Sequence, residues 1–390
     1  MISRLRSEFN EHWTPAGHQR FQEALTAECG GPVGFRLSET PCFFPRETLD
    51  RMAADGAELI RQLMEPAYLR ESDRSLPERY TVPNQSERPL FTQADFGLLR
   101  GADGEIDWRL VEIQGFPSLY AFQPALARAY IDAYALDTDL RYLLGGLDTC
   151  GYREALRRAI LGDADPAETV LLKVDPLRQK TLCDFRLTER ICGVRPVCVT
   201  RVTREGNRLF HEGAPIRRIY NRAIADEIER RGIRLPFDFR DDLDVEWAGH
   251  PNWYFRISKF SLPFLRHRTV PRTLFLDEVG ELPERLDDWV LKPLYSFAGS
   301  GVVLRPSRER IAAIEDRANY ILQERVDFTP LVETPYGADK IEVRVMYLWP
   351  DEGDLRAVCT IVRTGRGKMM GVDHNKDMEW VGASAALYEP

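Results

Sequence analysis

The sequence predicts a mixed α+β (mixed α/β) fold, because segments with helical and strand periodicity alternate along its 390 residues. Apolar residues recur at helical spacing over 50–68, a strand–turn–strand pattern covers 88–117, and the last hundred residues are rich in strand-forming segments. The chain is long enough for two or three subdomains that each bury a core. We expect four parts, at residues 1–87, 88–150, 151–245 and 246–390.

Composition narrows the class of protein. A hydrophobic fraction of 44% and a charged fraction of 29% are typical of a soluble globular protein, and a net charge of −8 argues against a broad nucleic-acid-binding surface. No apolar run approaches the ~18 residues of a membrane helix, and the N-terminus lacks a signal peptide. The seven cysteines form no Cys-x-x-Cys pair. We therefore expect a cytoplasmic protein with no nucleic-acid or membrane partner, and its oligomeric state stays open.

The first two parts are expected to be a mostly helical segment and a hairpin. Residues 1–87 carry the helical pattern, interrupted by a loop rich in glycine, proline and aromatics at 30–45. In the second part we expect strands at 90–99 and 108–114, joined by a glycine-containing turn, and then a helix at about 121–136.

The third part, residues 151–245, has the pattern of a small α/β unit. Apolar, β-branched runs alternate there with helical segments. The expected elements are strands at 169–174, 195–200 and 216–220 and helices at 181–192 and 223–231.

The fourth part is strand-rich. It begins with an amphipathic stretch at 255–268 and contains one expected helix, at about 307–319. The expected strands are 289–292, 302–305, 320–325, 341–348 and 357–363.

The most informative segment runs from Trp289 to Leu304. An apolar strand ends in Lys292-Pro293, a small flexible loop follows, and a second apolar strand begins at Val302. The loop consists of Ser296, Phe297, Ala298, Gly299, Ser300 and Gly301. Backbone N–H groups of such a loop can bind phosphate oxygens, and glycine permits close approach. The loop is neither a Walker A loop nor a Rossmann fingerprint. An ordinary β-hairpin has the same pattern, so the assignment depends on the surrounding residues.

Four further features add to this loop. Lys259 precedes Lys292 by 33 residues, Gln323-Glu324 ends an apolar strand whose edge could bind an adenine, and Arg344 and Arg363 lie on later expected strands. Each of these residues alone has the pattern of a solvated surface side chain. Their order, however, is that of the ATP-grasp ligases.

The metal ligands of an ATP-grasp protein are expected at the end of the chain, but the corresponding residues lie near its start. They are Asp95 and the segment Glu112-Ile-Gln114, in a strand, turn and strand that continue into Pro117-Ser118. We infer a circular permutation. Permuted order of this kind resembles the glutathionylspermidine synthase family (its synthetase domain), and the resemblance extends in motif order from residue 88 to residue 384.

The resemblance implies a circularly permuted ATP-grasp fold with an inserted small α/β (pre-ATP-grasp-like) domain. It implies ATP and Mg²⁺ as cofactors, and a carboxylate and an amine, small molecules or peptides, as substrates of an ADP-forming ligase that makes an amide through an acyl phosphate. Asp95, Glu112 and Gln114 would bind the metal, Arg344 and Arg363 would stabilise the transferring phosphoryl group, and ATP would contact Lys259, Lys292, Gln323, Glu324 and the loop from Ser296 to Gly301.

Two departures leave alternatives open. Gln114 replaces the family's metal-binding asparagine, and Gln93 replaces an arginine that helps to hold the substrate in the named enzymes. A phosphotransferase and a non-catalytic nucleotide-binding protein on the same fold therefore remain alternatives. A second possible metal set is Asp373, Asn375, Asp377 and Glu379, although we expect no strand after it.

The substrate side is expected to draw on residues 30–80 and on loops near 205–250. The polar candidates in the first of these regions are Arg36, Glu39, Tyr68, Arg70 and Arg74.

Overall fold

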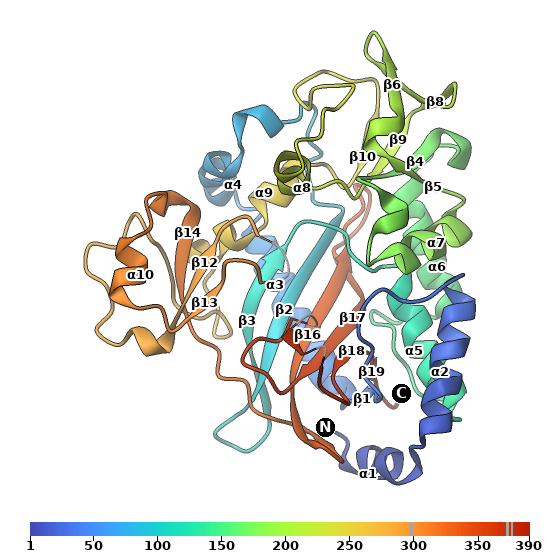
Figure 1. Cartoon of the computed structure of the whole chain (residues 1–390), viewed down its shortest axis with the longest axis vertical. Coiled ribbons are helices and arrows are strands. Elements are labelled where there is room, and N and C mark those ends of the chain that lie inside the picture. Colours follow the sequence, from blue (N-terminus) through green and yellow to red (C-terminus); the bar gives the residue numbers. More distant parts are fainter. Residues whose placement is uncertain (297–298, 372–373, 376) are drawn as a thin grey trace.

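The largest sheet of the molecule joins strands from the early and late parts of the chain (Figure 1). The computed structural model describes residues 1–296, 299–371, 374–375 and 377–390. In this central sheet the strand order is β18-β17-β16-β2-β3, every pair is antiparallel, and β15 pairs with β16. The strands are β2 (Phe91–Arg100), β3 (Ile106–Gln114), β15 (Val332–Thr334), β16 (Gly337–Leu348), β17 (Arg356–Gly365) and β18 (Gly382–Ser384). The expected hairpin is therefore confirmed and lies beside β16.

One face of the central sheet is covered by helix α3 (Arg46–Gln62), which Figure 1 shows behind the strands. The helix buries an apolar stripe that includes Leu49, Met52 and Leu59. The hydroxyl of Tyr347 on β16 donates to the carbonyl of Ala53 at 2.8 Å. Because α3 covers only one face, the opposite face of the central sheet can contact other parts of the chain.

A parallel sheet forms the core of the expected α/β unit. Its strand order is β10-β9-β4-β5. The strands are β4 (Thr169–Lys173), β5 (Arg195–Cys198), β9 (Arg218–Asn221) and β10 (Glu246–Ala248). The helices of this unit are α6 (Thr149–Leu161), α7 (Leu182–Cys192) and α8 (Ala225–Arg230). A separate three-stranded sheet consists of β6 (Val202–Glu205), β7 (Arg208–His211) and β8 (Ala214–Ile216).

A small antiparallel sheet lies on the other side of the central sheet (Figure 1). Its order is β11-β14-β12-β13, with β11 (Thr273–Phe275), β12 (Trp289–Pro293), β13 (Val303–Leu304) and β14 (Tyr320–Glu324). The amphipathic stretch before it forms α9 (Asn252–Arg256) and a 3₁₀ helix at Lys259–Phe264.

The helix expected at 307–319 is shorter than predicted. Helix α10 spans Arg308–Ala312, and a separate 3₁₀ turn follows at Arg317–Asn319. Ile311 is the buried residue of α10, and between Ile314 and Tyr320 the only apolar side chain is that of Ala318. The later residues therefore have no apolar face that packing could stabilise in a helix.

The two ends of the chain meet. The short strand β1 (Cys42–Phe43) pairs in parallel with β19 (Ala386–Leu387), and Figure 1 shows both termini at the same end of the molecule. The remaining helices are α1 (Ser3–His12), α2 (Pro15–Glu28), α4 (Pro66–Ser72) and α5 (Phe122–Ala133). In the described part of the chain, we find no helix with the length and apolar character needed to span a membrane.

Candidate functional site

Neighbouring strands of the central sheet present charged side chains on one face. In the register of the sheet, Asp95 on β2 lies opposite Glu112 on β3 and opposite Arg344 on β16. Glu342, two residues before Arg344, lies opposite Arg363 on β17. Directly opposed residues, and residues two apart on one strand, point to the same face of a sheet. The segments 95–114 and 342–363 therefore contribute to one cluster.

Asp95 is the centre of this cluster. One of its carboxylate oxygens accepts from Nε of Arg344 at 2.5 Å, and the other accepts from Nη2 of Arg344 at 2.6 Å and from Nη2 of Arg363 at 2.8 Å. Asp95 is only 1% exposed. Although burial alone would lower the pKa of Arg344, the neighbouring carboxylates, Asp95 foremost, raise it above its ordinary value. Both guanidinium groups are thus held in place.

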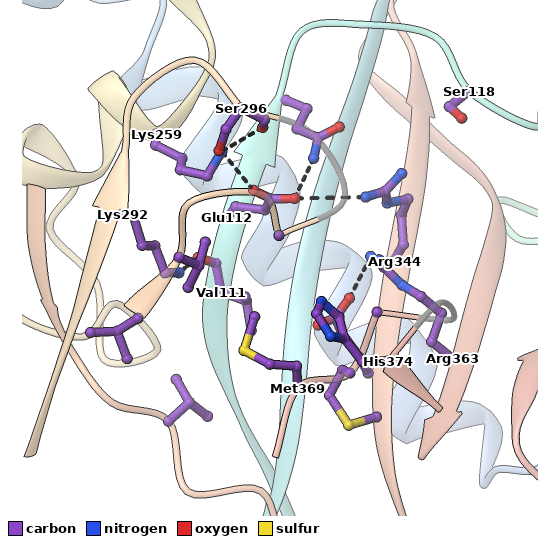
Figure 2. Close-up of a pocket in the computed structure, with 18 of the residues that line it drawn as sticks. Val111, Glu112, Ser118, Lys259, Lys292, Ser296, Arg344, Arg363, Met369 and His374 are labelled. Atoms are coloured by element: carbon purple, nitrogen blue, oxygen red, sulfur yellow. Dashed lines mark hydrogen bonds and ion pairs between the residues drawn. The ribbon is translucent and has the colours of Figure 1, made fainter. Parts of the chain in front are cut away.

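Glu112 lies between two cations (Figure 2). Lys259 approaches one carboxylate oxygen at 3.6 Å, and Arg344 approaches the other at 3.9 Å from the opposite side. The amide of Gln114 donates to the oxygen that faces Arg344. Burial alone would raise the pKa of Glu112, but Lys259, Arg344 and Lys292 lower it to about 2. Glu112 is consequently ionised at neutral pH.

The two predicted lysines lie on the side of the small antiparallel sheet. Lys292 donates to the carbonyl of Val111 at 3.0 Å and to the side chain of Gln323 at 2.5 Å. Burial lowers the pKa of Lys292 to about 8. Lys259 donates to the carbonyl of Ser296 at 2.9 Å, so it contacts the glycine-containing loop directly.

The glycine-containing loop meets a second segment, at residues 366–371 and 374–375. Gly299 and Gly301 both have φ of +74°, a conformation that glycine adopts without strain. A Cβ atom at Gly299 would lie 3.2 Å from the methyl carbon of Met369 and 3.7 Å from Nε2 of His374, so the loops are in contact. Phe297 and Ala298 lie outside the described residues, and Ser300 and Gly301 are exposed.

These groups line one large cavity of about 1010 Å³. Its walls combine residues from β3, β12, β14, β16 and β17. The predicted residues among them are Glu112, Gln114, Lys259, Lys292, Ser296, Gly299, Gln323, Glu324, Arg344 and Arg363. Asp95 does not line the cavity, but it contacts two arginines that do.

The end of the cavity at the small antiparallel sheet combines apolar and charged side chains. Val290, Val302, Leu304, Val326 and Phe328 line it together with Arg305, Glu324, Arg325 and Asp327. The expectation of an open strand edge at Gln323-Glu324 is wrong, because β14 lies between β11 and β12 and its backbone pairs on both sides. Gln323 and Glu324 line the cavity together with the segment that follows them, residues 325–328. Among the described residues, the Nε2 atom of Gln323 is buried and has no hydrogen-bond partner.

Glu342 is a cavity residue that the sequence reasoning missed. It is buried and forms an ion pair with Arg363. Burial raises the pKa of Glu342 to about 7, against the opposing effect of Arg363. The signal was available, because Glu342 lies two residues before Arg344 on the same predicted strand and must share its face.

The alternative metal set at 373–379 has a different structure. Asp373 lies outside the described residues, Asp377 and Glu379 are exposed, and the buried Asn375 accepts from the N–H of Gly367 at 2.9 Å and donates to the carbonyl of Met369 at 2.7 Å. Asn375 thus holds the described residues 367–369 of the second segment. The expectation that no strand follows is also wrong, because β18 follows at Gly382–Ser384. Within the described ranges, no three His, Cys, Asp or Glu side chains cluster as metal ligands would.

The polar residues expected on the substrate side do not line this cavity. Arg36 pairs with Glu39 at 2.5 Å, Tyr68 donates to the carbonyl of Arg256, and Arg74 lies 3.4 Å from Glu278. Those candidates were chosen because their side chains are polar. The other region expected on the substrate side, near 205–250, does contribute to the cavity, which is lined there by Arg222, Ile224, Glu227 and Arg230 and, before them, by residues between 173 and 181.

Comparison with known proteins identifies the fold. The chain is similar to a glutathione synthetase-like effector from Globodera pallida, solved in its apo form, with a TM-score of 0.58 and 13% identity. The alignment covers 96% of this chain and 98% of that chain. No family model matches the sequence, and neither does any curated protein. The chain therefore has a glutathione synthetase-like fold, and at this identity the likeness concerns the fold alone.

Proposed function

We propose that this chain is an ATP-dependent carboxylate–amine ligase with a circularly permuted ATP-grasp fold. One observation carries the proposal: features that the sequence predicted from separate segments line or contact one cavity. They are Lys259 and Lys292, the glycine-containing loop, the β2–β3 hairpin, and the strand arginines Arg344 and Arg363. The glutathione synthetase-like fold gives independent support. Pairing of β2 with β16 supports the permutation, because it brings the early hairpin next to a late strand.

The charges that line the cavity suit a nucleoside triphosphate. Thirteen lysines and arginines line it against five aspartates and glutamates, in a chain whose net charge is −8. Such a local excess of positive charge favours a polyanion. Lys259 and Lys292 would neutralise the phosphates, and the apolar side chains at the small antiparallel sheet, with the unpartnered amide of Gln323, would receive the base.

Glu112 and Gln114 fit a magnesium ion. Both offer side-chain oxygens at the cavity, and magnesium in nucleotide sites is commonly held by one or two carboxylates together with the phosphates. When bound, the ion would neutralise charge on the phosphates. Asp95 would have to release at least one arginine to join these ligands.

The residues of the cavity suit phosphoryl transfer to a carboxylate. The substrate carboxylate would attack the γ-phosphate of ATP, giving an acyl phosphate and ADP, and an amine would then displace phosphate and form the amide. Arg344 and Arg363, held by Asp95, would stabilise the negative charge on the transferring group. The two loops that meet at Gly299 and Met369 would exclude water.

Thermal unfolding with and without Mg-ATP tests nucleotide binding. Ligand at ~100 times its dissociation constant should stabilise the wild type by ~2.7 kcal/mol, a rise of a few degrees in Tm. Glu112→Ala should lose this shift yet keep the Tm of the unliganded protein within a few degrees. The matched control is Glu105→Ala, which removes an exposed carboxylate at the far end of the same hairpin.

Trapping with hydroxylamine then tests the reaction class. Acids that stimulate ADP release should yield acyl hydroxamates if an acyl phosphate forms. ADP release with a phosphorylated acceptor and no hydroxamate would indicate a phosphotransferase. Absence of any Mg-ATP shift in the wild type would remove the ligase proposal.

A further inference from the structure

The proposed amide-forming step needs a proton acceptor, and no side chain has yet been assigned to it. A primary amine is protonated at neutral pH, as the side chain of lysine is, and an ammonium group has no lone pair with which to attack. The proton must therefore leave where the acyl phosphate forms. A side chain positioned to accept such a proton typically accelerates a reaction by about 10²–10⁴-fold.

The carboxylates of the cavity differ in whether they can accept this proton. Those that line it are Glu112, Glu227, Glu324, Asp327 and Glu342. Although burial opposes them, the cations around Glu112 lower its pKa to about 2, so it is a weak base. Glu227 is paired with Lys173 at 2.5 Å. Glu324, Asp327 and His374, which also lines the cavity, are exposed to water. Glu342 is the carboxylate that remains.

Glu342 lies on β16, beside the two arginines assigned to the phosphoryl group. It points to the same face of the sheet as Arg344, and it lies opposite Arg363 on β17. The residue is 5% exposed, and its Oε1 atom contacts Nη2 of Arg363 without the geometry of a hydrogen bond. Within the described part of the chain, this buried oxygen has no hydrogen-bond partner.

The Oε1 atom of Glu342 is available to a ligand because Arg363 donates its hydrogen bond elsewhere. Nη2 of Arg363 donates to Asp95 at 2.8 Å. A buried carboxylate oxygen that lacks a donor is unfavourable, and an N–H group of a ligand in the cavity would supply one. An ammonium group offers both the N–H and a positive charge. The free oxygen therefore favours an amine as its partner.

Charged groups on four strands surround Glu342. They are Arg363 on β17, Arg344 on β16, Asp95 on β2 and Glu112 on β3. Burial raises the pKa of Glu342 to about 7, the two other carboxylates add to this rise, and the two arginines oppose it. A carboxylate with a pKa near neutral can both take up and release a proton at neutral pH.

We propose that Glu342 is the catalytic base that deprotonates the attacking amine. Its Oε1 atom would accept a proton from the substrate ammonium, and its contact with Arg363 places it beside the acyl phosphate. The amine nitrogen would then form a bond to the carbonyl carbon as the bond from that carbon to the phosphate oxygen breaks. Phosphate leaves with the electron pair and takes up the proton that the nitrogen loses as the amide forms. This inference rests on the proposed ligase function and adds a catalytic residue to it.

A comparison of two nucleophiles tests the inference. Hydroxylamine is uncharged at neutral pH and needs no base, whereas a primary alkylamine must first lose a proton. With an acid that stimulates ADP release, Glu342→Gln should form the acyl hydroxamate at close to the wild-type rate. Amide formation with a panel of primary alkylamines should fall about hundredfold or more. Raising the pH should restore amide formation in Glu342→Gln, because more of the amine is then uncharged.

Two further variants separate catalysis from a structural role. Glu342→Asp keeps a carboxylate and should restore part of the amide formation. Glu333→Gln removes an exposed carboxylate from β15, which pairs with β16, and should form both products as the wild type does. If hydroxamate and amide formation fall together in Glu342→Gln, Glu342 acts by holding Arg363 and the inference is overturned. Unchanged amide formation in Glu342→Gln would overturn it as well.

The wild type keeps the two proposals apart. If it shows no Mg-ATP shift in Tm, or forms no hydroxamate with any acid, the ligase function is contradicted and the assignment of Glu342 fails with it. If it forms hydroxamate but no amide with any of the amines, the acyl phosphate stands and the assignment of a base for the amine is contradicted. Glu342→Gln should retain the Mg-ATP shift that Glu112→Ala loses, because Glu342 is needed only after phosphoryl transfer.

Discussion

Asp95 shows how one side chain can determine the arrangement of a whole site. Its carboxylate is buried and accepts from both strand arginines, and its partner on the next strand, Glu112, is the carboxylate that faces the cavity. Alternation along the two strands predicts that both carboxylates share a face, but only the register shows which of them the arginines occupy. The structure therefore favours an orienting role for Asp95.

Replacing Asp95 with asparagine should separate orientation from metal binding. The amide keeps the shape but loses the charge that holds two guanidinium groups, so we expect turnover to fall about hundredfold or more. The Mg-ATP shift in Tm should remain, in contrast to Glu112→Ala. If Asp95→Asn loses the shift as completely as Glu112→Ala does, Asp95 is a metal ligand.

His250 is a second residue whose charge state is fixed by its surroundings. Its Nε2 lies 3.0 Å from the carbonyl of Pro83, and its Nδ1 accepts from the N–H of Asn252 at 3.3 Å. A carbonyl can only accept and an N–H can only donate, so these partners select one neutral tautomer. Burial lowers the pKa of His250 to about 4.

This pKa predicts that the protein loses stability in mild acid. Between about pH 6.5 and pH 4 the unfolded chain binds a proton at this histidine and the folded chain does not, so the free energy of unfolding should fall as the pH falls, by up to about 3 kcal/mol. The free energy of unfolding, measured with urea at several pH values in this range, should depend less on pH in His250→Gln than in the wild type. His12→Gln, at an exposed position, is the control and should show the same dependence on pH as the wild type.

At the scale of elements, the position of helix α3 depends on one glycine. A Cβ atom at Gly56 would lie 2.1 Å from the hydroxyl oxygen of Tyr347 and 3.3 Å from the Cβ of Ala94. Both neighbours belong to central strands, β16 and β2. The missing side chain therefore lets the helix approach the face of the sheet opposite the cavity.

Gly56→Ala should destabilise the protein despite the higher helix propensity of alanine. The propensity gain is about 1 kcal/mol, whereas overpacking against Tyr347 costs about 1–3 kcal/mol or more. In a Tyr347→Phe background the cost should shrink, because the nearest atom is removed. Thermal unfolding of the four proteins measures this difference, and equal costs in both backgrounds would show that the hydroxyl is not the obstacle.

The elements most visible in the sequence were those with a local signal. The β2–β3 hairpin has alternating apolar residues on both sides of a turn with two glycines, and the strands of the parallel sheet are short apolar runs. Helix α10 was overextended because charged residues at 315–317 are compatible with a helix but bury nothing. The interior position of β14 was missed because strand order depends on contacts distant in sequence.

At the scale of the whole molecule, motif order predicted part of the cavity and could not predict the rest. The expected lysines, Glu112 and the strand arginines do line it. Its second end was expected only in part, through the region 205–250, which contains Arg222 and Arg230. Lys173 and Arg178 were missed because they belong to no motif, and only the placement of the α/β unit against the central sheet makes them cavity residues. The position of that unit is therefore central to the site.

A buried ion pair helps to hold the α/β unit in this position. Asp184 at the start of α7 accepts from the N–H groups of Ala121 and Phe122, at 3.0 and 3.1 Å, where α5 begins. Its second oxygen accepts from Arg222 at 2.6 Å, and both side chains are almost fully buried, with 0% and 4% exposure. One carboxylate thus links the unit to the segment that follows β3.

Asp184→Asn should accordingly destabilise the protein far more than loss of an exposed pair. Without the carboxylate, Arg222 is a buried charge with no counterion, and breaking such a pair costs about 3–5 kcal/mol. The control is Asp132→Asn, which breaks the exposed pair with Arg128 (2.8 Å) and should cost about 1 kcal/mol or less. Urea unfolding measures both costs. A variant as stable as Asp132→Asn would show that this pair does not hold the unit in place.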